Sequence, residues 1–255
     1  MEPFAIISDI HSNLEALQAV LAEIDRRGLR RVVCLGDVVG YGANPRECLD
    51  LVADRCEVIL CGNHDHAVFY EPHNFNVGAE RANYWTRQLF EEEPDKAKRD
   101  RRWEVLGRLP VKHALDGFLF VHGSPRRPIN EYLFAEDVYT NPNKILSNFD
   151  RMDDHRICFV GHTHVPGVFL DDPYFEPPDE LAEPGRYVFG DEKDIVNVGS
   201  VGQPRDRDPR AAFGVVDQEG VEFCRVEYDL QVAVRKIHDI AELDDFLGNR
   251  LLDGR

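Results

Sequence analysis

The first 61 residues alternate between apolar strand-like runs and helical stretches, and this alternation limits the possible folds more than any other feature. Three short apolar runs occupy residues 4–8, 31–35 and 57–61. Between the first two, leucines and an isoleucine recur at helical spacing until Gly28. Asn44-Pro45 opens a second predicted helix. This order predicts parallel strands joined by right-handed crossovers, with ligands bound beyond the carboxyl ends of the strands.

The rest of the chain is first helical and then rich in strands. Residues 70–108 are polar with helical character, and we interpret them as an inserted helical cap. Asp116-Gly117 separates two apolar runs and predicts a hairpin. Residues 171–186, rich in proline and acid, are predicted to be a surface loop, and residues 229–252 to be closing helices. We therefore expect one α/β domain over residues 1–255, with two mixed sheets packed face to face and helices outside.

The charge balance excludes several classes of partner. The net charge is −17, from 47 acidic and 30 basic residues, which argues against non-specific binding of nucleic acid or anionic membranes. No apolar run approaches the roughly 20 residues that span a bilayer. The first residues do not resemble a signal peptide, so we expect a cytoplasmic protein. The six cysteines form no C-x-x-C pair and are predicted to be reduced.

Five short polar motifs follow predicted strands, where an α/β active site is expected. They are Asp9-Ile10-His11, Gly36-Asp37, Gly62-Asn63-His64-Asp65, His122-Gly123 and Gly161-His162-Thr163-His164. In an extended segment, residues two apart point to the same side, so each D-x-H or H-x-H pair can face one cavity. A single histidine at a strand end is more often structural than a ligand. The joint occurrence of all five motifs predicts a metal site.

The ordered set D-x-H, G-D, G-N-H-D, H-G and G-H-T-H resembles that of the calcineurin-like metallophosphoesterase superfamily. The opening residues 8–13 resemble its small prokaryotic phosphodiesterase branch. The resemblance implies a four-layer α/β/β/α sandwich with a binuclear metal centre. It implies that His64 is not a ligand and faces the substrate phosphoryl group and leaving oxygen. It further implies one metal held by Asp9, His11 and His164, a second held by Asn63, His122 and His162, and Asp37 bridging the two.

The predicted donors suit the chemistry of phosphate ester hydrolysis. Two divalent ions roughly 3.5–4 Å apart can share a hydroxide and stabilise the attacking and leaving oxygens of an in-line displacement. Imidazole, carboxylate and amide donors suit Mn, which we expect first, and also Fe, Zn, Co or Ni. The ions bring more positive charge than Asp9, Asp37 and the hydroxide remove. This surplus supplies the attraction for an anionic substrate that the acidic surface lacks.

The sequence thus predicts a metal-dependent phosphoesterase acting on a small phosphodiester or phosphoanhydride, with nucleotides among the candidates. A dinucleoside-polyphosphate hydrolase and a phosphomonoesterase or protein phosphatase are the alternatives within enzymes. The alternative outside enzymes is a protein-binding scaffold on the same fold. A scaffold member of this family lacks the histidine of the N-H pair, whereas His64 is present here.

Several further residues have two interpretations each. Asp65 is predicted to orient His64 or to cap a helix, with the first preferred. Arg126 and Arg127 either contact substrate or form surface salt bridges. For the polar loop with Gln203, Arg205 and Arg207, a surface position is preferred over a contact with the cleft. The cap, with its aromatic residues Tyr84, Trp85, Phe90 and Trp103, is either a lid over the leaving-group side or a structural insertion.

Overall fold

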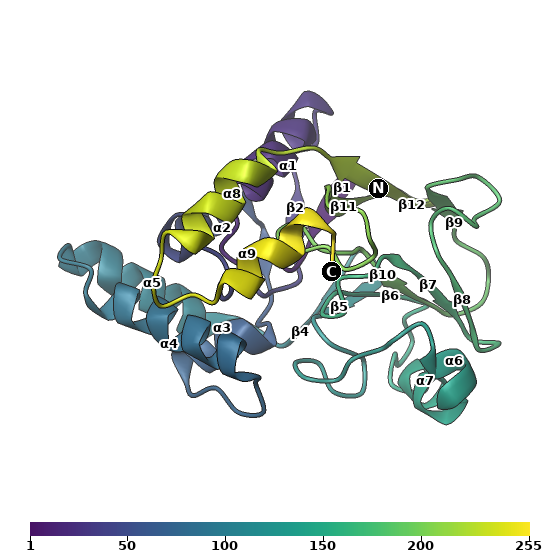
Figure 1. The fold of residues 1–255 in the computed structure, drawn as a ribbon. Coiled ribbons are helices and arrows are strands. Elements are labelled where there is room, and N and C mark those ends of the chain that lie inside the picture. Colours follow the sequence, from purple (N-terminus) through teal and green to yellow (C-terminus); the bar gives the residue numbers. More distant parts are fainter.

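The computed structural model describes residues 1–255 and contains two six-stranded mixed sheets flanked by helices (Figure 1). The first sheet has the order β3 (Val58–Ile59), β2 (Val32–Cys34), β1 (Phe4–Ile7), β11 (Ala211–Val216), β12 (Gly220–Val226) and β9 (Arg186–Val188). The second has the order β4 (Lys112–Leu115), β5 (Phe118–Val121), β6 (Ile157–Val160), β10 (Asp194–Asn197), β7 (Gly167–Leu170) and β8 (Tyr174–Glu176). The predicted α/β fold with two mixed sheets is confirmed.

The parallel unit at the start of the chain is present as predicted. Strand β1 pairs in parallel with β2, and β2 pairs in parallel with β3. The crossovers are helices α1 (Leu14–Arg26) and α2 (Pro45–Arg55). The hairpin at Asp116-Gly117 also forms, since β4 and β5 pair antiparallel on either side of it. Strand β11 then returns to pair antiparallel with β1, which makes the first sheet mixed.

Alternation along the strands places one apolar layer between the sheets and one on each outer side. On β1, Phe4 and Ile6 pack between the sheets, whereas Ala5 and Ile7 pack against the helix side. On β5, Phe120 packs between the sheets and faces away from α6 (Asp137–Thr140) and α7 (Pro142–Phe149). Both faces of each central strand are therefore buried, which gives the four layers.

The predicted loop at residues 171–186 is wrong in part, because it contains strand β8 and ends at the start of β9. These short strands lie at the outer edges of the two sheets, where β8 pairs only with β7 and β9 only with β12. Proline and acidic residues are typical of such edges, because they prevent pairing with another chain. The proline-rich and acidic composition of this segment therefore predicted a loop where β8 and the start of β9 form.

Residues 63–108 form three helices, α3 (Asn63–Phe69), α4 (Val77–Glu91) and α5 (Lys96–Arg108), which lie beside α2 at one end of the molecule (Figure 1). Phe90 is fully buried, and its ring meets that of Trp103 edge to face at 5.9 Å. Arg102 is buried and pairs with Asp50 of α2 and with Glu93. Phe90 and Trp103 therefore serve packing on the helix side and do not form a lid.

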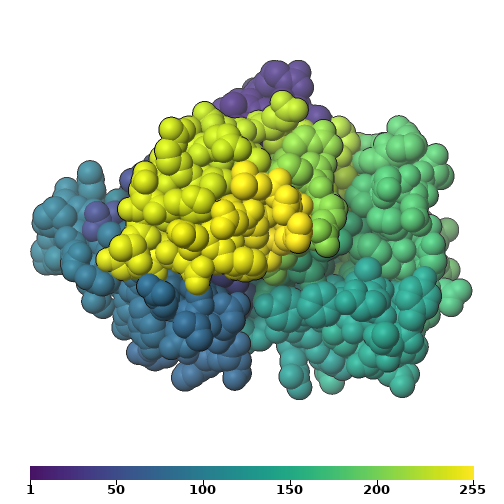
Figure 2. Space-filling model, in the orientation of Figure 1, coloured from purple at the N-terminus to yellow at the C-terminus, as the bar shows by residue number.

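Two C-terminal helices, α8 (Leu230–His238) and α9 (Asp245–Leu252), close the fold as predicted. Figure 2 shows this yellow segment lying between the blue helices and the green second-sheet region. Ala79 and Ala82 of α4 pack against Ile237 and Leu247. All six cysteines are free, as expected. None of the helices combines the length and the apolar character that crossing a membrane requires.

Candidate metal centre

The five motifs converge at the carboxyl ends of the central strands of both sheets. Asp9 and His11 follow β1, Asp37 follows β2, Asn63 and His64 begin α3, His122 follows β5, and His162 and His164 follow β6. All eight side chains are buried. The donor atoms of Asp9, His11 and His164 lie within 4.8 Å of one another, and so do those of Asp37, His122 and His162. His11, Asp37 and His64 form a third such set, which shares one residue with each of these two neighbouring groups.

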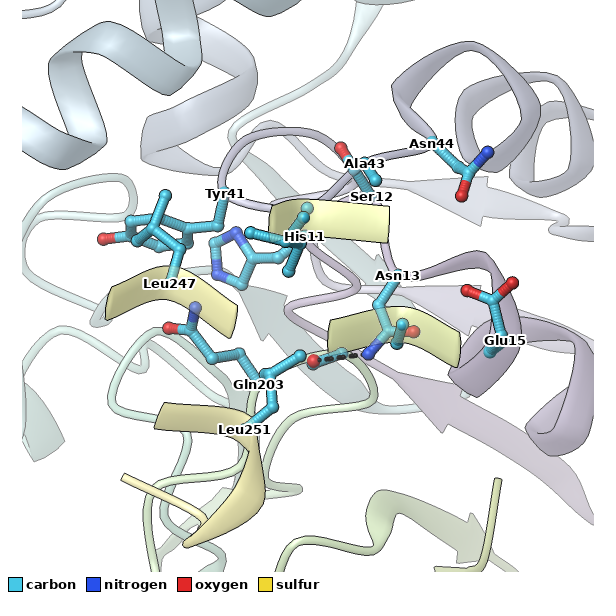
Figure 3. Close-up of a pocket in the computed structure, with 14 residues that line it drawn as sticks. His11, Ser12, Asn13, Glu15, Tyr41, Ala43, Asn44, Gln203, Leu247 and Leu251 are labelled. Carbon is cyan, nitrogen blue, oxygen red and sulfur yellow. Dashed lines mark hydrogen bonds between the residues drawn. The ribbon is translucent and has the colours of Figure 1, made fainter. Parts of the chain in front are cut away.

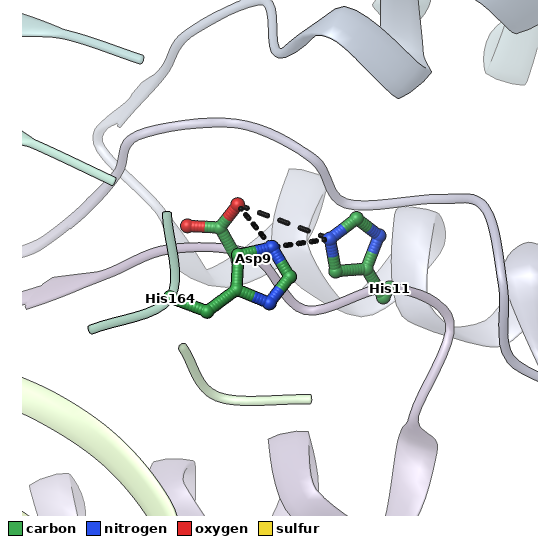
Figure 4. A group of neighbouring side chains, drawn as sticks. All are labelled: Asp9, His11 and His164. Carbon is green, nitrogen blue, oxygen red and sulfur yellow. Dashed lines mark hydrogen bonds and ion pairs between the residues drawn. The ribbon is translucent and has the colours of Figure 1, made fainter. Parts of the chain in front are cut away.

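The first group is shown in Figure 4. His164 Nε2 lies 3.2 Å from Asp9 Oδ1 and 3.1 Å from His11 Nε2. His11 Nε2 is also 3.8 Å from Asp9 Oδ1. Three donors from two different sheets therefore point at one position.

The second group adjoins the first through Asp37. His122 Nε2 lies 3.4 Å from Asp37 Oδ2, 3.2 Å from Asn63 Oδ1 and 3.2 Å from His162 Nδ1. Asp37 Oδ2 is also 3.6 Å from His11 Nε2, which belongs to the first group. Asp37 is therefore the one carboxylate close to both groups.

Hydrogen bonds fix the imidazole tautomers in the form that binds a metal. The Nδ1 atoms of His11, His122 and His164 lie 3.3, 3.1 and 2.6 Å from the backbone oxygens of Val39, Leu35 and Gln203. Each Nδ1–H can donate to a carbonyl, which leaves the Nε2 lone pair facing the centre, as is usual for metal-binding histidines. Two such lone pairs cannot bond to each other, yet His11 Nε2 lies 3.1 Å from His164 Nε2, and Asp9 Oδ1 is buried without a partner. A divalent cation in each group would satisfy these donors.

The ionisation states also favour cation binding. Burial lowers the pKa of His162 to about 3 and that of His164 to about 4, and it lowers the pKa of His11 as well. Burial opposes ionisation of Asp37, but the neighbouring histidines, His122 above all, hold its pKa well below the usual value. Burial likewise lowers the pKa of His122, but Asp37 raises it to about 9. Near neutral pH the centre therefore offers the neutral imidazoles of His11, His162 and His164 beside charged carboxylates, whereas His122 must release its proton before it can bind a cation.

The backbone at the centre adopts a conformation that non-glycine residues rarely take. The φ angles of Asp9, His11, Asp37, His162 and His164 are 53°, 48°, 52°, 67° and 63°. Such left-handed residues cost of order 1–3 kcal/mol each and persist only where the surroundings hold them. The Asp9 carbonyl accepts hydrogen bonds from the amide of Gly202 at 2.9 Å and from Ser200 Oγ at 2.8 Å. The loop after β10 therefore fixes the first ligand segment.

Gly62 is needed where two ligand loops touch. A Cβ atom at Gly62 would overlap with the backbone amide and the carboxylate of Asp37. We expect Gly62→Ala to displace Asp37, to lower the bound metal per chain and to reduce thermal stability. Gly78→Ala on α4 is the control, because its Cβ would meet no atom closer than 3.6 Å. Elemental analysis and thermal unfolding measure both variants, and full metal content in Gly62→Ala would contradict this role.

His64 lies beside both groups, and its hydrogen-bond partner is Asn83 of α4 and not Asp65. His64 Nδ1 is 3.0 Å from Asn83 Oδ1. Asp65 instead accepts the backbone amides of Val38, Val39 and Gly62 at 3.0, 3.2 and 3.0 Å, so it fixes the loop after β2 and the start of α3. Asn83 was not predicted from the sequence, because one asparagine on a helix belongs to no motif.

The remaining candidates divide between the surface and the cleft. Arg126 is exposed and binds Glu131 and Ser147, and Arg127 is exposed beside it. The surface interpretation of the later loop is wrong for Gln203, which is buried and whose carbonyl oxygen lies within hydrogen-bonding distance of His164 Nδ1. It is also wrong for Arg205, which lies over the ring of Tyr41. Arg207 is exposed as predicted.

Two hollows adjoin the centre. A cavity of about 280 Å³ is lined by Asn63, His162, Phe75, Asn130 and Tyr132, among others, and no lysine or arginine lines it. The Tyr132 ring stacks on that of His162 at 3.7 Å. Figure 3 shows a second, much narrower pocket, where Tyr41 and Gln203 lie beside His11. Tyr132 was not among the residues predicted from the sequence.

Comparisons with known proteins agree with this geometry. Residues 3–220 match the model of the calcineurin-like phosphoesterase superfamily domain. The chain is 39% identical to an uncharacterized protein of Methanocaldococcus jannaschii, over 98% of each chain. It is similar to the crystal structure of a metallophosphoesterase from Sphaerobacter thermophilus, with a TM-score of 0.81 and 35% identity over 99% of each chain. A hypothetical protein of Pyrococcus horikoshii OT3 has the same fold, with a TM-score of 0.77 and 19% identity, over 100% of this chain and 99% of that one.

Proposed function

Because this chain belongs to the calcineurin-like phosphoesterase superfamily, we propose that its buried donors bind two divalent metal ions and hydrolyse a phosphodiester or phosphoanhydride. The family is that of metal-dependent hydrolases, and its substrates are phosphorylated. The position of Asp37, close to both donor groups, carries the proposal. In a two-metal site one carboxylate must reach both ions, and only Asp37 is placed to do so.

We assign the ligands as follows. One ion is held by Asp9, His11 and His164, the other by Asn63, His122 and His162, and Asp37 is shared. Mn²⁺ is our first choice for the ions, and Fe, Zn, Co or Ni fit the same oxygen and nitrogen donors. When bound, two such ions activate a water near neutral pH and stabilise the attacking and leaving oxygens.

The protein's own residues orient the substrate and supply a proton. His64 Nδ1–H donates to Asn83, which leaves Nε2 as the free nitrogen beside the centre. We propose that His64 acts in its doubly protonated form: Nδ1–H stays bonded to Asn83, while Nε2–H gives its proton to the leaving oxygen and the ring returns to the neutral form. The rings of Tyr41 and Phe75 lie 4.4 and 4.8 Å from the His64 ring and restrict its movement. An imidazole that is held in one orientation loses little further freedom when it transfers a proton, which lowers the barrier of that step.

The neighbouring cavity favours an ester with an organic group. Its volume of about 280 Å³ lies near the lower end of small-molecule pockets, and it opens beside Asn63 and His162. Phe75, Asn130 and Tyr132 offer it apolar and uncharged polar surface, and Glu71 is the one acidic residue of its lining. A polyphosphate chain needs cations, which this cavity lacks, so a phosphodiester with a small uncharged group fits better.

A substrate screen tests the proposal. Protein reconstituted with Mn²⁺ is offered phosphomonoesters, small phosphodiesters and dinucleoside polyphosphates at equal concentration. We expect the highest kcat/KM on a small diester, and no hydrolysis by metal-free protein. A higher kcat/KM on a dinucleoside polyphosphate or a monoester would show that the substrate is of that class and not a small phosphodiester. Absence of hydrolysis on every class, with two metals bound, would contradict the proposed function itself.

A further inference from the structure

Two arginines beside the metal centre lack the carboxylate partners that every other shielded arginine has. Arg205 lies in the loop between β10 and β11, Arg250 lies on α9, and both are half-buried. Neither forms an ion pair with a carboxylate side chain, whereas all other arginines that are at least partly buried do: Arg31, Arg46, Arg55, Arg87, Arg99, Arg102, Arg186 and Arg225. In a protein of net charge −17, two shielded arginines without a counterion require an explanation.

The position of Arg205 is fixed by the metal centre itself. Its backbone amide donates to the His164 carbonyl at 3.2 Å. Its guanidinium carbon lies 6.0 Å from the centre of the Tyr41 ring. That ring is in turn 4.7 Å from the ring of His11 and 4.4 Å from that of His64. Arg205 therefore borders the centre on the side of Tyr41.

The hydrogen bonds of the two guanidinium groups are incomplete. Arg205 donates to Gln203 Oε1 at 2.8 Å, but its Nε is buried and has no partner. Arg250 donates to the backbone oxygen of Arg255 and lies 5.4 Å from the Phe246 ring. Burial and the charge of Arg205 lower the pKa of Arg250 to about 10. Buried donors without partners are costly, and two neighbouring cations repel each other, so a bound anion would relieve both effects.

We propose that Arg205, supported by Arg250, binds an anionic phosphate oxygen on the Tyr41 side of the metal centre. This inference rests on the proposed function and adds the residues that hold the substrate anion. The planar guanidinium offers several donors that match the oxygens of a phosphate group. Arg205 lies on a different side from the cavity beside Asn63 and His162, whose lining contains neither arginine. The anionic oxygens and the organic group of the substrate would thus meet surfaces of different character.

The experiment uses the full-length, metal-loaded protein and inorganic phosphate as the probe. Binding of radiolabelled phosphate is measured by equilibrium dialysis, and KM and kcat are measured with bis-p-nitrophenyl phosphate. The variants are Arg205→Gln, Arg205→Lys and Arg250→Gln. Arg207→Gln is the matched control, because it removes the same charge from an exposed position in the same loop. Metal content and thermal stability are checked for each variant.

We expect Arg205→Gln to weaken phosphate binding by roughly tenfold or more, the usual size for a lost hydrogen bond to a charged group. KM should rise more than kcat falls. Arg205→Lys should recover part of the affinity, Arg250→Gln should cause a smaller loss, and Arg207→Gln should match the native protein. If Arg205→Gln does not fold, the graded effects of Arg205→Lys and Arg250→Gln still test the site.

Equal phosphate affinity in Arg205→Gln and Arg207→Gln would overturn the inference. A fall in kcat alone, with phosphate binding unchanged, would also overturn it. Dialysis requires no turnover, so the two proposals can fail separately. Phosphate binding that depends on Arg205 in a protein without hydrolytic activity would retain the anion site and remove the proposed function.

Discussion

Asp37→Ala is expected to remove bound metal and hydrolytic activity together. Asp37 Oδ2 lies 3.4 Å from His122 Nε2 and 3.6 Å from His11 Nε2, so its loss deprives both donor groups of negative charge. The fall in kcat/KM should exceed the roughly 10–100-fold that loss of an outer-shell partner of a metal site costs. Elemental analysis gives metal per chain, and a small activated diester gives activity. Asp25→Ala is the control, since this exposed carboxylate pairs only with Arg55 on the surface.

Chelation should reproduce this result in the native chain. Metal-free protein should be inactive, and Mn²⁺ should restore turnover in proportion to the metal bound. Asp37→Ala should not recover at the same metal concentration. Retention of two metals per chain in Asp37→Ala would contradict the shared role of this carboxylate, and full turnover by verified metal-free protein would contradict the whole mechanism.

His64→Ala should separate chemistry from metal binding. We expect kcat to fall roughly 10²–10⁴-fold, the usual contribution of general acid–base catalysis, with metal content nearly unchanged. Asn83→Leu removes the acceptor 3.0 Å from His64 Nδ1 and should cause a smaller fall in the same direction. The decrease in kcat should be smaller for both variants on a diester with a good leaving group, because such a group needs less protonation. His113→Ala on the edge strand β4 is the control. Loss of metal from His64→Ala would place this histidine among the ligands.

The sequence predicted the parts of this fold that repeat a local pattern. The alternating apolar runs and helices predicted the β1–β2–β3 unit, although only Val58 and Ile59 of the run 57–61 form a strand. The Leu60 amide still donates to Cys34 of β2, but the next amide, that of Cys61, donates to Pro110, so the pairing with β2 ends there. Strands β7 to β9 escaped prediction because they are short and mostly lie at or near sheet edges.

In the candidate site, too, local sequence patterns predicted some residues and not others. Its proposed ligands were found because each belongs to a short motif behind a strand. The sequence did not predict Asn83 or Tyr132, and it favoured a surface position for Arg205. Tertiary contacts between distant segments place each of these residues at the site. The left-handed backbone at Asp9, His11 and Asp37 was equally hidden. Residue types with a Cβ atom give no local signal for that conformation, which the packed loops impose.

The hydrogen bonds to the Asp9 carbonyl have a consequence for the order in which the protein matures on the ribosome. Asp9 is synthesised 191 residues before Ser200, yet its loop is held by Ser200 and Gly202, and β1 gains its second neighbour only with β11. The Asp9 segment can therefore reach its final conformation only after residues 200–216 have emerged. Metal insertion should then be a late step, which follows the completion of both sheets and does not nucleate them.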